Sequence, residues 1–227
     1  MRPPRPAWVA ELVTGTASAQ AHHLSRFLPP PGHERRSAVL MLFGSRSGAH
    51  GRGPDGVDVL LTERASTLRA HAGQVAFPGG RIDDTDADPG SAALREAEEE
   101  TGLRPDGVEL LAELPDLYLP VSDYAVTPVL AWWHTPSPIG VLDAAEVARV
   151  VRVPVAELVD PANRFLAVHP SGFTGPAFRV QDLFVWGFTA GLLDRLLHLA
   201  GWERPWDAAR LEDVPLPDPP ADRSARA

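Results

Sequence analysis

The sequence predicts an α+β domain in which strands and two main helices form layers around one core. Three observations support this class. Short apolar runs of strand length recur along the chain and are bounded by glycine and proline. Two longer segments carry helical patterns, one rich in glutamate and the other rich in leucine. A length of 227 residues, with 44% hydrophobic and 22% charged residues, suits a single globular domain.

The first part of the chain is expected to contain one helix and two strands. Residues 6–28 form an amphipathic helix that the proline-rich run 29–32 ends. Residues 38–43 and 57–62 form buried strands, joined by a loop rich in glycine, serine and arginine. Strands joined in this way are usually antiparallel neighbours. The expected inward positions of the helix are Trp8, Leu12, Ala19 and Leu24.

A glycine pair separates the next strand from the first main helix. Residues 75–77 form a short strand that enters the pair at 79–80. The helix begins near Asp88 or Ser91 and stops at Gly102, a residue suited to a helix C-terminus.

Strands dominate the second half of the chain. They are predicted at residues 108–114, 124–133 and 147–153, with a helical turn at 154–158. Pro128 lies inside the second of these strands and suggests a bulge or a sheet edge, because proline lacks an N–H.

The C-terminal part is expected to contain a hairpin, the second main helix and a tail. Residues 165–169 and 177–180 form the hairpin, and residues 187–200 form the helix. The tail from Asp207 is rich in proline and charge, and we expect it to lack fixed structure. The predicted organisation is an N-terminal helix and linker at residues 1–36, a main domain at 37–203 and a tail at 204–227.

Composition argues against several functional classes. A net charge of −9 opposes general nucleic-acid binding, which needs basic surface. The absence of cysteine removes disulfides and thiol nucleophiles, and the absence of lysine leaves arginine to bind phosphate. No apolar run approaches the roughly 18–20 residues that span a membrane. The apolar stretch 8–13 is short and carries Glu11, which argues against a signal peptide, so we expect a cytoplasmic protein.

Three glutamates share one face of the first main helix. Glu96, Glu99 and Glu100 stand at i, i+3 and i+4, and carboxylates so close repel one another unless a cation lies among them. Mg²⁺ and Mn²⁺ prefer oxygen ligands and often combine carboxylates with substrate phosphates. Arg95 is placed to pair with Glu99 and fix its rotamer. A solvated acidic helix face is the alternative, but the neighbouring glycines, Arg95 and the spacing favour a metal site for phosphate chemistry.

The segment from Arg95 to Leu103 resembles the core of the Nudix box, whose pattern is G-x5-E-x7-R-E-U-x-E-E-x-G-U with U aliphatic. Gly80 matches the first glycine of the box if one extra residue is allowed, and Asp86 then takes the place of its first glutamate. The resemblance implies the Nudix α/β/α sandwich with a mixed central β-sheet.

A second segment, just upstream, narrows the resemblance. Residues 60–80 resemble the motif that precedes the box in coenzyme A pyrophosphatases of the Nudix superfamily. The one extra residue within the box also resembles the box of that subfamily. This implies hydrolysis of the pyrophosphate bond of coenzyme A, or of its acyl or oxidised derivatives, to 3′,5′-ADP and 4′-phosphopantetheine or its derivative. Mg²⁺ or Mn²⁺ is the implied cofactor. The expected partner is a small-molecule substrate, and binding to nucleic acid or to a membrane is not expected. A homodimer is the candidate assembly.

The resemblance also implies roles for the residues of the box. Glu96 and Glu100 are expected to bind the metal, Glu99 to act as ligand or base, and the Gly80 carbonyl to add an oxygen ligand. Arg95 is expected to orient Glu99.

Four residues outside the box complete the predicted site. Glu146 is the candidate general base, with a plain surface glutamate as the alternative. Arg64, Arg69 and His71 are expected to serve the coenzyme A end of the substrate, in particular its 3′-phosphate. The alternative is that Arg69 and His71 brace the loop that carries Gly79 and Gly80.

Two other functions stay open. The same chemistry on another nucleoside diphosphate derivative, such as ADP-ribose, is opposed by the upstream motif. A non-catalytic Nudix-fold binding module is opposed by the intact glutamates of the helix, because a binding module needs no such cluster of charge.

Overall fold

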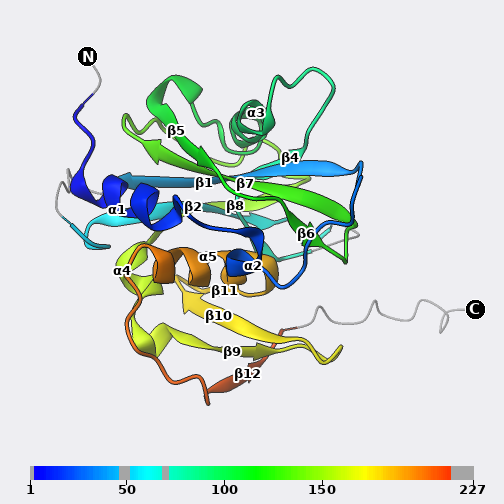
Figure 1. Ribbon diagram of the computed structural model, residues 1–227, viewed down its shortest axis with the longest axis vertical. Helices are drawn as coiled ribbons and strands as arrows, with labels where there is room; N and C mark the ends of the chain where they lie inside the picture. The colour runs from blue at the N-terminus through cyan, green and yellow to red at the C-terminus, as the bar shows by residue number, and fades with distance from the viewer. Residues whose placement is uncertain (1–2, 46–51, 68–71, 216–227) are drawn as a thin grey trace, which may run out of the picture.

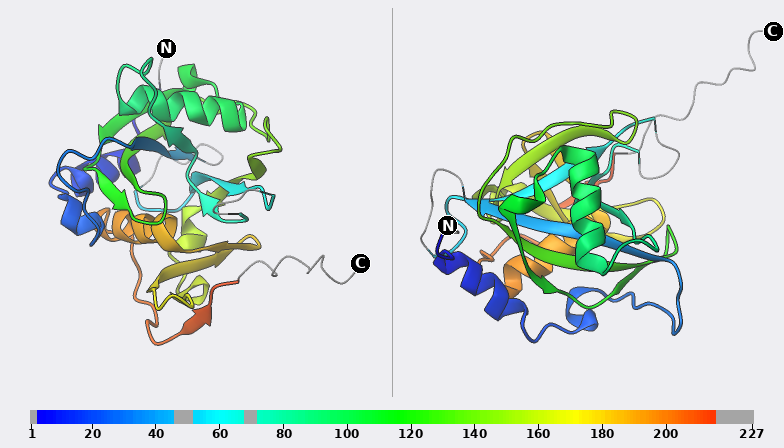
Figure 2. Two further views of the ribbon diagram at one scale, coloured as in Figure 1. Left: turned by 90° about the vertical axis from the view of Figure 1, so that its right-hand side faces the viewer. Right: turned by 90° about the horizontal axis from the view of Figure 1, so that it is seen from above.

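The computed structural model describes residues 3–45, 52–67 and 72–215, which are arranged in layers (Figure 1). Helix α3 (Pro89–Thr101) covers one face of an eight-stranded mixed sheet. The opposite face is covered by α1 (Ala7–Thr16), α2 (Ala21–Leu24) and α5 (Gly187–Leu199). A second sheet of four strands lies beyond these helices, at the end of the molecule opposite α3 (Figure 2). The predicted α/β/α sandwich with a mixed central sheet is confirmed, and the second sheet adds a layer.

The large sheet is organised around two parallel central strands, β1 and β7, which pair along most of their length. As predicted, β1 and β2 are antiparallel neighbours. Strand β2 also pairs with β3 and β8, whereas β5 and β6 flank β7 and β4 flanks β1. The strands of this sheet are β1 (Arg36–Ser45), β2 (Val57–Arg64), β3 (Val75–Ala76), β4 (Gly79–Arg81), β5 (Val108–Glu113), β6 (Leu117–Leu119), β7 (Tyr124–Trp133) and β8 (Val147–Pro154).

Strand β1 is buried on both of its faces. Leu40 and Leu42 pack with the alanines of α3, whereas Met41 and Phe43 join the larger core formed with α1 and α5. All four side chains are fully buried. A strand covered on both sides reads as a continuous apolar run, which is why the sequence indicated it so clearly.

The single N-terminal helix predicted over residues 6–28 is wrong in its extent. Helix α1 ends at Thr16, and the chain becomes helical again only in α2. Residues 14–16 are Thr-Gly-Thr, which favour a helix only weakly. A side chain at Gly15 would also lie 2.1 Å from the carbonyl oxygen of Leu199, so α1 meets α5 backbone to backbone and stops there. The four predicted inward side chains of this segment are nevertheless all buried. In the part of the chain that is described, every helix is too short or too polar to cross a bilayer.

Pro128 occupies neither a sheet edge nor a bulge of its own strand. It lies inside β7, where the antiparallel partner changes from β6 to β5. Its carbonyl oxygen accepts a hydrogen bond from the N–H of Leu114 (2.8 Å). The N–H that proline lacks is therefore missing at the point where β7 passes from one antiparallel partner to the other. The register shift of this pairing lies in β5, between Leu110 and Ala112.

The second sheet confirms the predicted hairpin and corrects the predicted tail. The hairpin strands pair antiparallel, and Leu211–Asp213 adds a strand parallel to the first of them. The expectation of no fixed structure from Asp207 is therefore wrong up to residue 215, because Val214 is buried in the small core of this sheet. The residues from 216 onward lie outside the described part. The strands are β9 (Arg164–Val168), β10 (Thr174–Val180), β11 (Leu183–Val185) and β12 (Leu211–Asp213).

A buried arginine joins the second sheet to α5. The side chain of Arg164 is 1% exposed, and it is paired with Asp194 and with Glu203 (3.3 Å). Its guanidinium also lies over the ring of Trp206, 4.5 Å from the centroid. Two carboxylates and an aromatic face compensate the burial of this charge.

Candidate active site

The termini of α3 are set by local signals, as predicted. The Asp88 carboxylate accepts a hydrogen bond from the backbone N–H of Ser91 (2.7 Å), so it caps the helix N-terminus. Gly102 adopts a left-handed conformation (φ 71°), and its N–H donates to the carbonyl oxygen of Glu98. The alanines of α3 pack against the sheet. This packing fixes the rotation of the helix about its axis and therefore the direction in which its glutamate side chains point.

Two glutamates of α3 meet the glycine pair at the start of β4. The N–H of Gly79 donates to Oε2 of Glu100 (3.3 Å), and Glu100 is 5% exposed. A Cβ atom on Gly80 would lie 2.4 Å from Cδ of Glu96, and one on Gly79 would lie 2.3 Å from the carbonyl oxygen of Ala38. Gly79 is therefore needed for the close approach of β4 to β1, whereas Gly80 leaves room for the Glu96 carboxylate. The structure brings Glu96 and Glu100 close to the glycine pair, and their predicted role as metal ligands stays a prediction.

Arg95 ties the helix to the loop that precedes it. Its Nε and Nη2 atoms donate to the two carboxylate oxygens of Asp86 (3.1 and 3.0 Å), and Nη1 donates to Glu96 (3.0 Å) and Glu99 (3.2 Å). Nη2 also donates to the carbonyl oxygen of Arg81 (3.0 Å). The hydrogen bond with Asp86 raises the pKa of Arg95, and the same contact lowers the pKa of Asp86. The pairing of Arg95 with Glu99 that the sequence predicted is confirmed.

Sequence reasoning did not assign a role to Asp86 or to Gly79. Asp86 stands where the box has glutamate, yet its side chain is only 6% exposed and holds Arg95 through two hydrogen bonds. Its neighbour Asp83 donates a backbone N–H to it (2.8 Å). The signal available in the sequence was the Asp-x-x-Asp spacing before the helix.

Burial and mutual repulsion perturb the carboxylates of the cluster. The pKa of Glu100 is raised to about 7, first by burial and then by the charges of Glu96 and Glu146, whereas the Gly79 N–H and Arg64 act in the opposite direction. Burial also raises the pKa of Glu96, against the hydrogen bond from Arg95. Both groups therefore hold protons more tightly than a free glutamate does, because burial disfavours the charged form and the neighbouring carboxylates add repulsion.

Glu146 belongs to the same neighbourhood although it is far away in sequence. Its side chain is exposed, and its charge raises the pKa of both Glu96 and Glu100. Its carbonyl oxygen accepts from the N–H of Ala65 (2.8 Å) at the end of β2. The loop before it is tied to the end of α3, where the N–H of Gly140 donates to the carbonyl oxygen of Thr101 (2.9 Å). The candidate base is thus placed beside the helix carboxylates.

The ligand set predicted for a metal is only partly assembled. Within residues 3–45, 52–67 and 72–215, no three or more histidine, aspartate or glutamate side chains are arranged to hold a metal ion as they stand. The Glu99 side chain is 60% exposed, and Arg95 lies between its carboxylate and that of Glu96. The donors gathered here are nevertheless all oxygen atoms, which fits the chemistry of Mg²⁺ or Mn²⁺.

Of the three predicted residues of the upstream motif, the structure describes only Arg64. Arg64 is the last residue of β2, and its charge lowers the pKa of Glu100. Arg69 and His71 lie outside the described residues.

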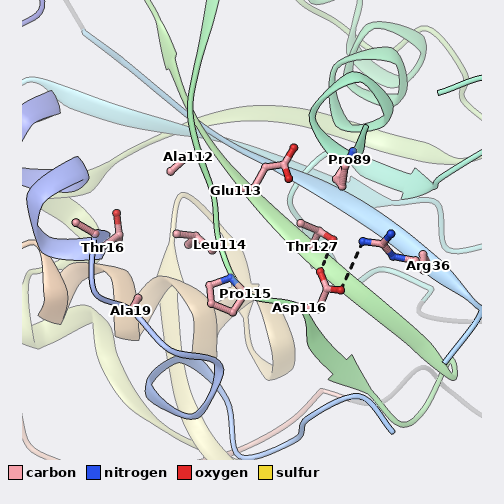
Figure 3. Close-up of a pocket in the computed structure, with 11 residues that line it drawn as sticks. Thr16, Ala19, Arg36, Pro89, Ala112, Glu113, Leu114, Pro115, Asp116 and Thr127 are labelled. Atoms are coloured by element: carbon pink, nitrogen blue, oxygen red, sulfur yellow. Dashed lines mark hydrogen bonds and ion pairs between the residues drawn. The ribbon is translucent and has the colours of Figure 1, made fainter. Parts of the chain in front are cut away.

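A separate cavity of about 410 Å³ opens at the other end of α3 (Figure 3). It lies between the N-terminal segment, Pro89 and the connection from β5 to β6. Asp116 at its wall accepts a hydrogen bond from Oγ1 of Thr127 (2.6 Å) and pairs with Arg36 (3.5 Å). The residues that line it do not include any of the predicted site residues.

Comparisons with known proteins identify the family of the chain. A family model described as the NUDIX domain matches residues 34–173. An uncharacterized Nudix hydrolase NudL from Cronobacter sakazakii is 44% identical over 145 residues, which is 61% of this chain and 72% of that protein. The protein of the same description from Escherichia coli K12 is 42% identical over the same shares of the two chains. Among solved structures, the Nudix hydrolase RenU from M. smegmatis aligns with a TM-score of 0.46 and 20% identity, over 76% of this chain and 89% of that chain. The matched region covers more than half of the chain and contains the glycine pair and the carboxylates of α3, and the chain therefore belongs to the Nudix family.

Proposed function

We propose that this Nudix protein hydrolyses the pyrophosphate bond of coenzyme A, or of its acyl or oxidised derivatives, to 3′,5′-ADP and 4′-phosphopantetheine or its derivative. The observation that carries the reaction type is the meeting of Glu96 and Glu100 with the glycine pair of β4. The choice of coenzyme A is supported by residues 60–80, which resemble the motif of coenzyme A pyrophosphatases and end beside this cluster.

The residues present fit a divalent cation by their chemistry. Glu96 and Glu100 would hold Mg²⁺ or Mn²⁺, with Glu99 and the carbonyl of Gly80 as further oxygen donors. When bound, the cation supplies positive charge that offsets the charge on the phosphate oxygens. The raised pKa values of Glu96 and Glu100 are consistent with this role, because a cation would relieve the excess of negative charge.

The protein side chains would orient the site and move one proton. Asp86 holds Arg95, and Arg95 holds the carboxylates of Glu96 and Glu99 in place. Glu146 would take a proton from the attacking water. The water oxygen forms a bond to phosphorus, the bridging P–O bond breaks, and the released phosphate takes the electron pair of that bond.

A turnover assay with several diphosphates tests this proposal. The metal-free protein is incubated with coenzyme A, acetyl-coenzyme A, 3′-dephospho-coenzyme A or ADP-ribose, with Mn²⁺, with Mg²⁺ or with excess chelator. Products are identified by chromatography and mass. We expect 3′,5′-ADP from coenzyme A with either metal and no turnover in chelator.

Each other outcome points to a defined alternative. Faster hydrolysis of ADP-ribose than of any coenzyme A form would mean that ADP-ribose is the better substrate, while the proposed hydrolysis of a pyrophosphate bond would stand. Binding without turnover of any of the four compounds would favour a non-catalytic module. Full activity after verified metal removal would contradict the role given to the carboxylates.

A further inference from the structure

Arg64 brings a positive charge to the acidic cluster from the large sheet. In β2, side chains alternate between the two faces of the sheet. Leu60 packs with the α3 alanines, whereas Leu61 joins the core on the opposite face. The ladder between β2 and β8 is irregular at Glu63 and Arg64, but the extra residue, Ala148, belongs to β8. The alternation of β2 therefore continues, and Arg64, four residues after Leu60, emerges on the face that α3 covers.

The neighbours of Arg64 place it between the two parts of the site. It is paired with Val147 across the sheet, next to Glu146, and the following residue, Ala65, donates its N–H to the carbonyl oxygen of Glu146 (2.8 Å). On the other side, its charge acts on Glu100, the penultimate residue of α3. The guanidinium thus belongs to the space between the candidate base and the helix carboxylates.

The described residues do not fully satisfy the hydrogen-bond donors of the Arg64 guanidinium. Its Nε atom is buried and has no hydrogen-bond partner within the part of the chain that the structure describes. Arg149, on the neighbouring strand β8, differs in having a carboxylate partner, Glu63 (3.3 Å). A buried donor without a partner is unfavourable, and an acceptor on a ligand would satisfy it.

We infer that Arg64 binds the oxygens of the pyrophosphate at the reaction centre, not the remote 3′-phosphate of coenzyme A. This inference rests on the proposed function. The carboxylates of α3 and Glu146 mark where the scissile bond must lie, and Arg64 stands between them. The 3′-phosphate sits across the ribose from the pyrophosphate, so one guanidinium at this position serves the pyrophosphate. An arginine suits the task because its planar fork matches two phosphate oxygens.

Two substrates that differ only in the 3′-phosphate test the inference. Arg64→Ala should lower kcat/KM for coenzyme A and for 3′-dephospho-coenzyme A by the same factor, between about ten- and a hundred-fold for a lost charge-assisted hydrogen bond. Arg64→Lys, which keeps the charge, should recover part of the loss on both. Arg149→Ala is the matched control, because Arg149 lies on the strand that pairs with β2 and is held by Glu63 and by the carbonyl oxygen of Gln181. It should stay within about twofold of the unmodified protein. A loss confined to coenzyme A, or no loss on either compound, would overturn the inference.

A binding measurement tests the role of Arg64 independently of whether coenzyme A is the substrate. Methylenediphosphonate carries the two phosphorus groups without a nucleotide and cannot be hydrolysed. Calorimetry with Mg²⁺ should show that it binds the unmodified protein, and that Arg64→Ala weakens binding by about ten- to a hundred-fold. Equal affinities, or no binding by the unmodified protein, would overturn the inference. If the two proteins differ in this assay while neither coenzyme A form is cleaved, the proposed substrate fails and the role of Arg64 stands.

Discussion

Replacing Glu100 with glutamine should stabilise the metal-free protein at pH 8. Glu100 is 5% exposed, and its pKa is raised from 4.5 to about 7. Between these values the unfolded chain has released its proton while the folded chain retains it, so the free energy of unfolding falls as pH rises through this window. At about 1.4 kcal/mol per pKa unit, the loss reaches about 3 kcal/mol above pH 7.

Glutamine removes the charge and keeps the shape of the side chain. Its amide oxygen still accepts the hydrogen bond that the N–H of Gly79 donates to Glu100. Glu100→Gln should therefore match the unmodified protein at pH 4.5 and exceed it by about 3 kcal/mol at pH 8 in chelator. This difference corresponds to roughly 6–12 °C in Tm for a chain of this size.

Urea unfolding at pH 4.5 and pH 8, both in excess chelator, measures the two free energies. Glu98→Gln is the matched control, because Glu98 lies two residues away on the exposed flank of α3 and this variant keeps Glu100. Its free energy of unfolding should therefore follow that of the unmodified protein at both pH values. Adding Mn²⁺ at pH 8 should narrow the gap by stabilising the unmodified protein. If Glu100→Gln is no more stable than the unmodified protein at pH 8 in chelator, the burial argument is refuted.

Three further predictions concern catalysis and the second sheet. Glu100→Gln should lower kcat by at least about 10²-fold in a Mn²⁺ assay while the fold is kept, and near-normal turnover would remove the assignment of this carboxylate. Asp86→Asn should lower kcat about tenfold with little change in thermal stability, because Arg95 loses about one charge-assisted hydrogen bond to Asp86 and is held less firmly. An unchanged kcat would contradict a positioning role for Asp86. Arg164→Leu should lower the free energy of unfolding in urea by about 3–5 kcal/mol, because it leaves the partly buried carboxylates of Asp194 and Glu203 without their arginine partner, against less than about 1 kcal/mol for the exposed Arg179→Leu. Similar losses in both arginine variants would show that burial does not govern the difference.

Much of the fold followed from local patterns. The buried strands β1 and β7 were visible as apolar runs, and α3 was visible from its cap and its glycine stop. The misjudged elements depended on contacts between distant segments. The N-terminal helix breaks where Gly15 meets α5, and β12 exists because it finds β9 as a partner. Neither contact leaves a periodic signal in the sequence.

The candidate site divides in the same way. The spacing of Glu96, Glu99 and Glu100 fixed which side chains share a face of α3, because helical geometry depends only on position along the chain. Their environments were not predictable from spacing. Glu100 is buried and Glu99 is exposed because the sheet covers one flank of the helix and leaves the other in solvent.

The sequence by itself determined the chemistry that this protein brings together: a glycine pair, a helix of carboxylates, an arginine to order them and a Nudix scaffold to carry them. Only the tertiary structure decided which residues from elsewhere join that helix. Asp86 reaches Arg95 from the preceding loop, and the charges of Arg64, at the end of β2, and of Glu146, just before β8, act on the carboxylates. The physical reason is that periodicity specifies the face on which a side chain lies, whereas the packing of the layers specifies what that face meets.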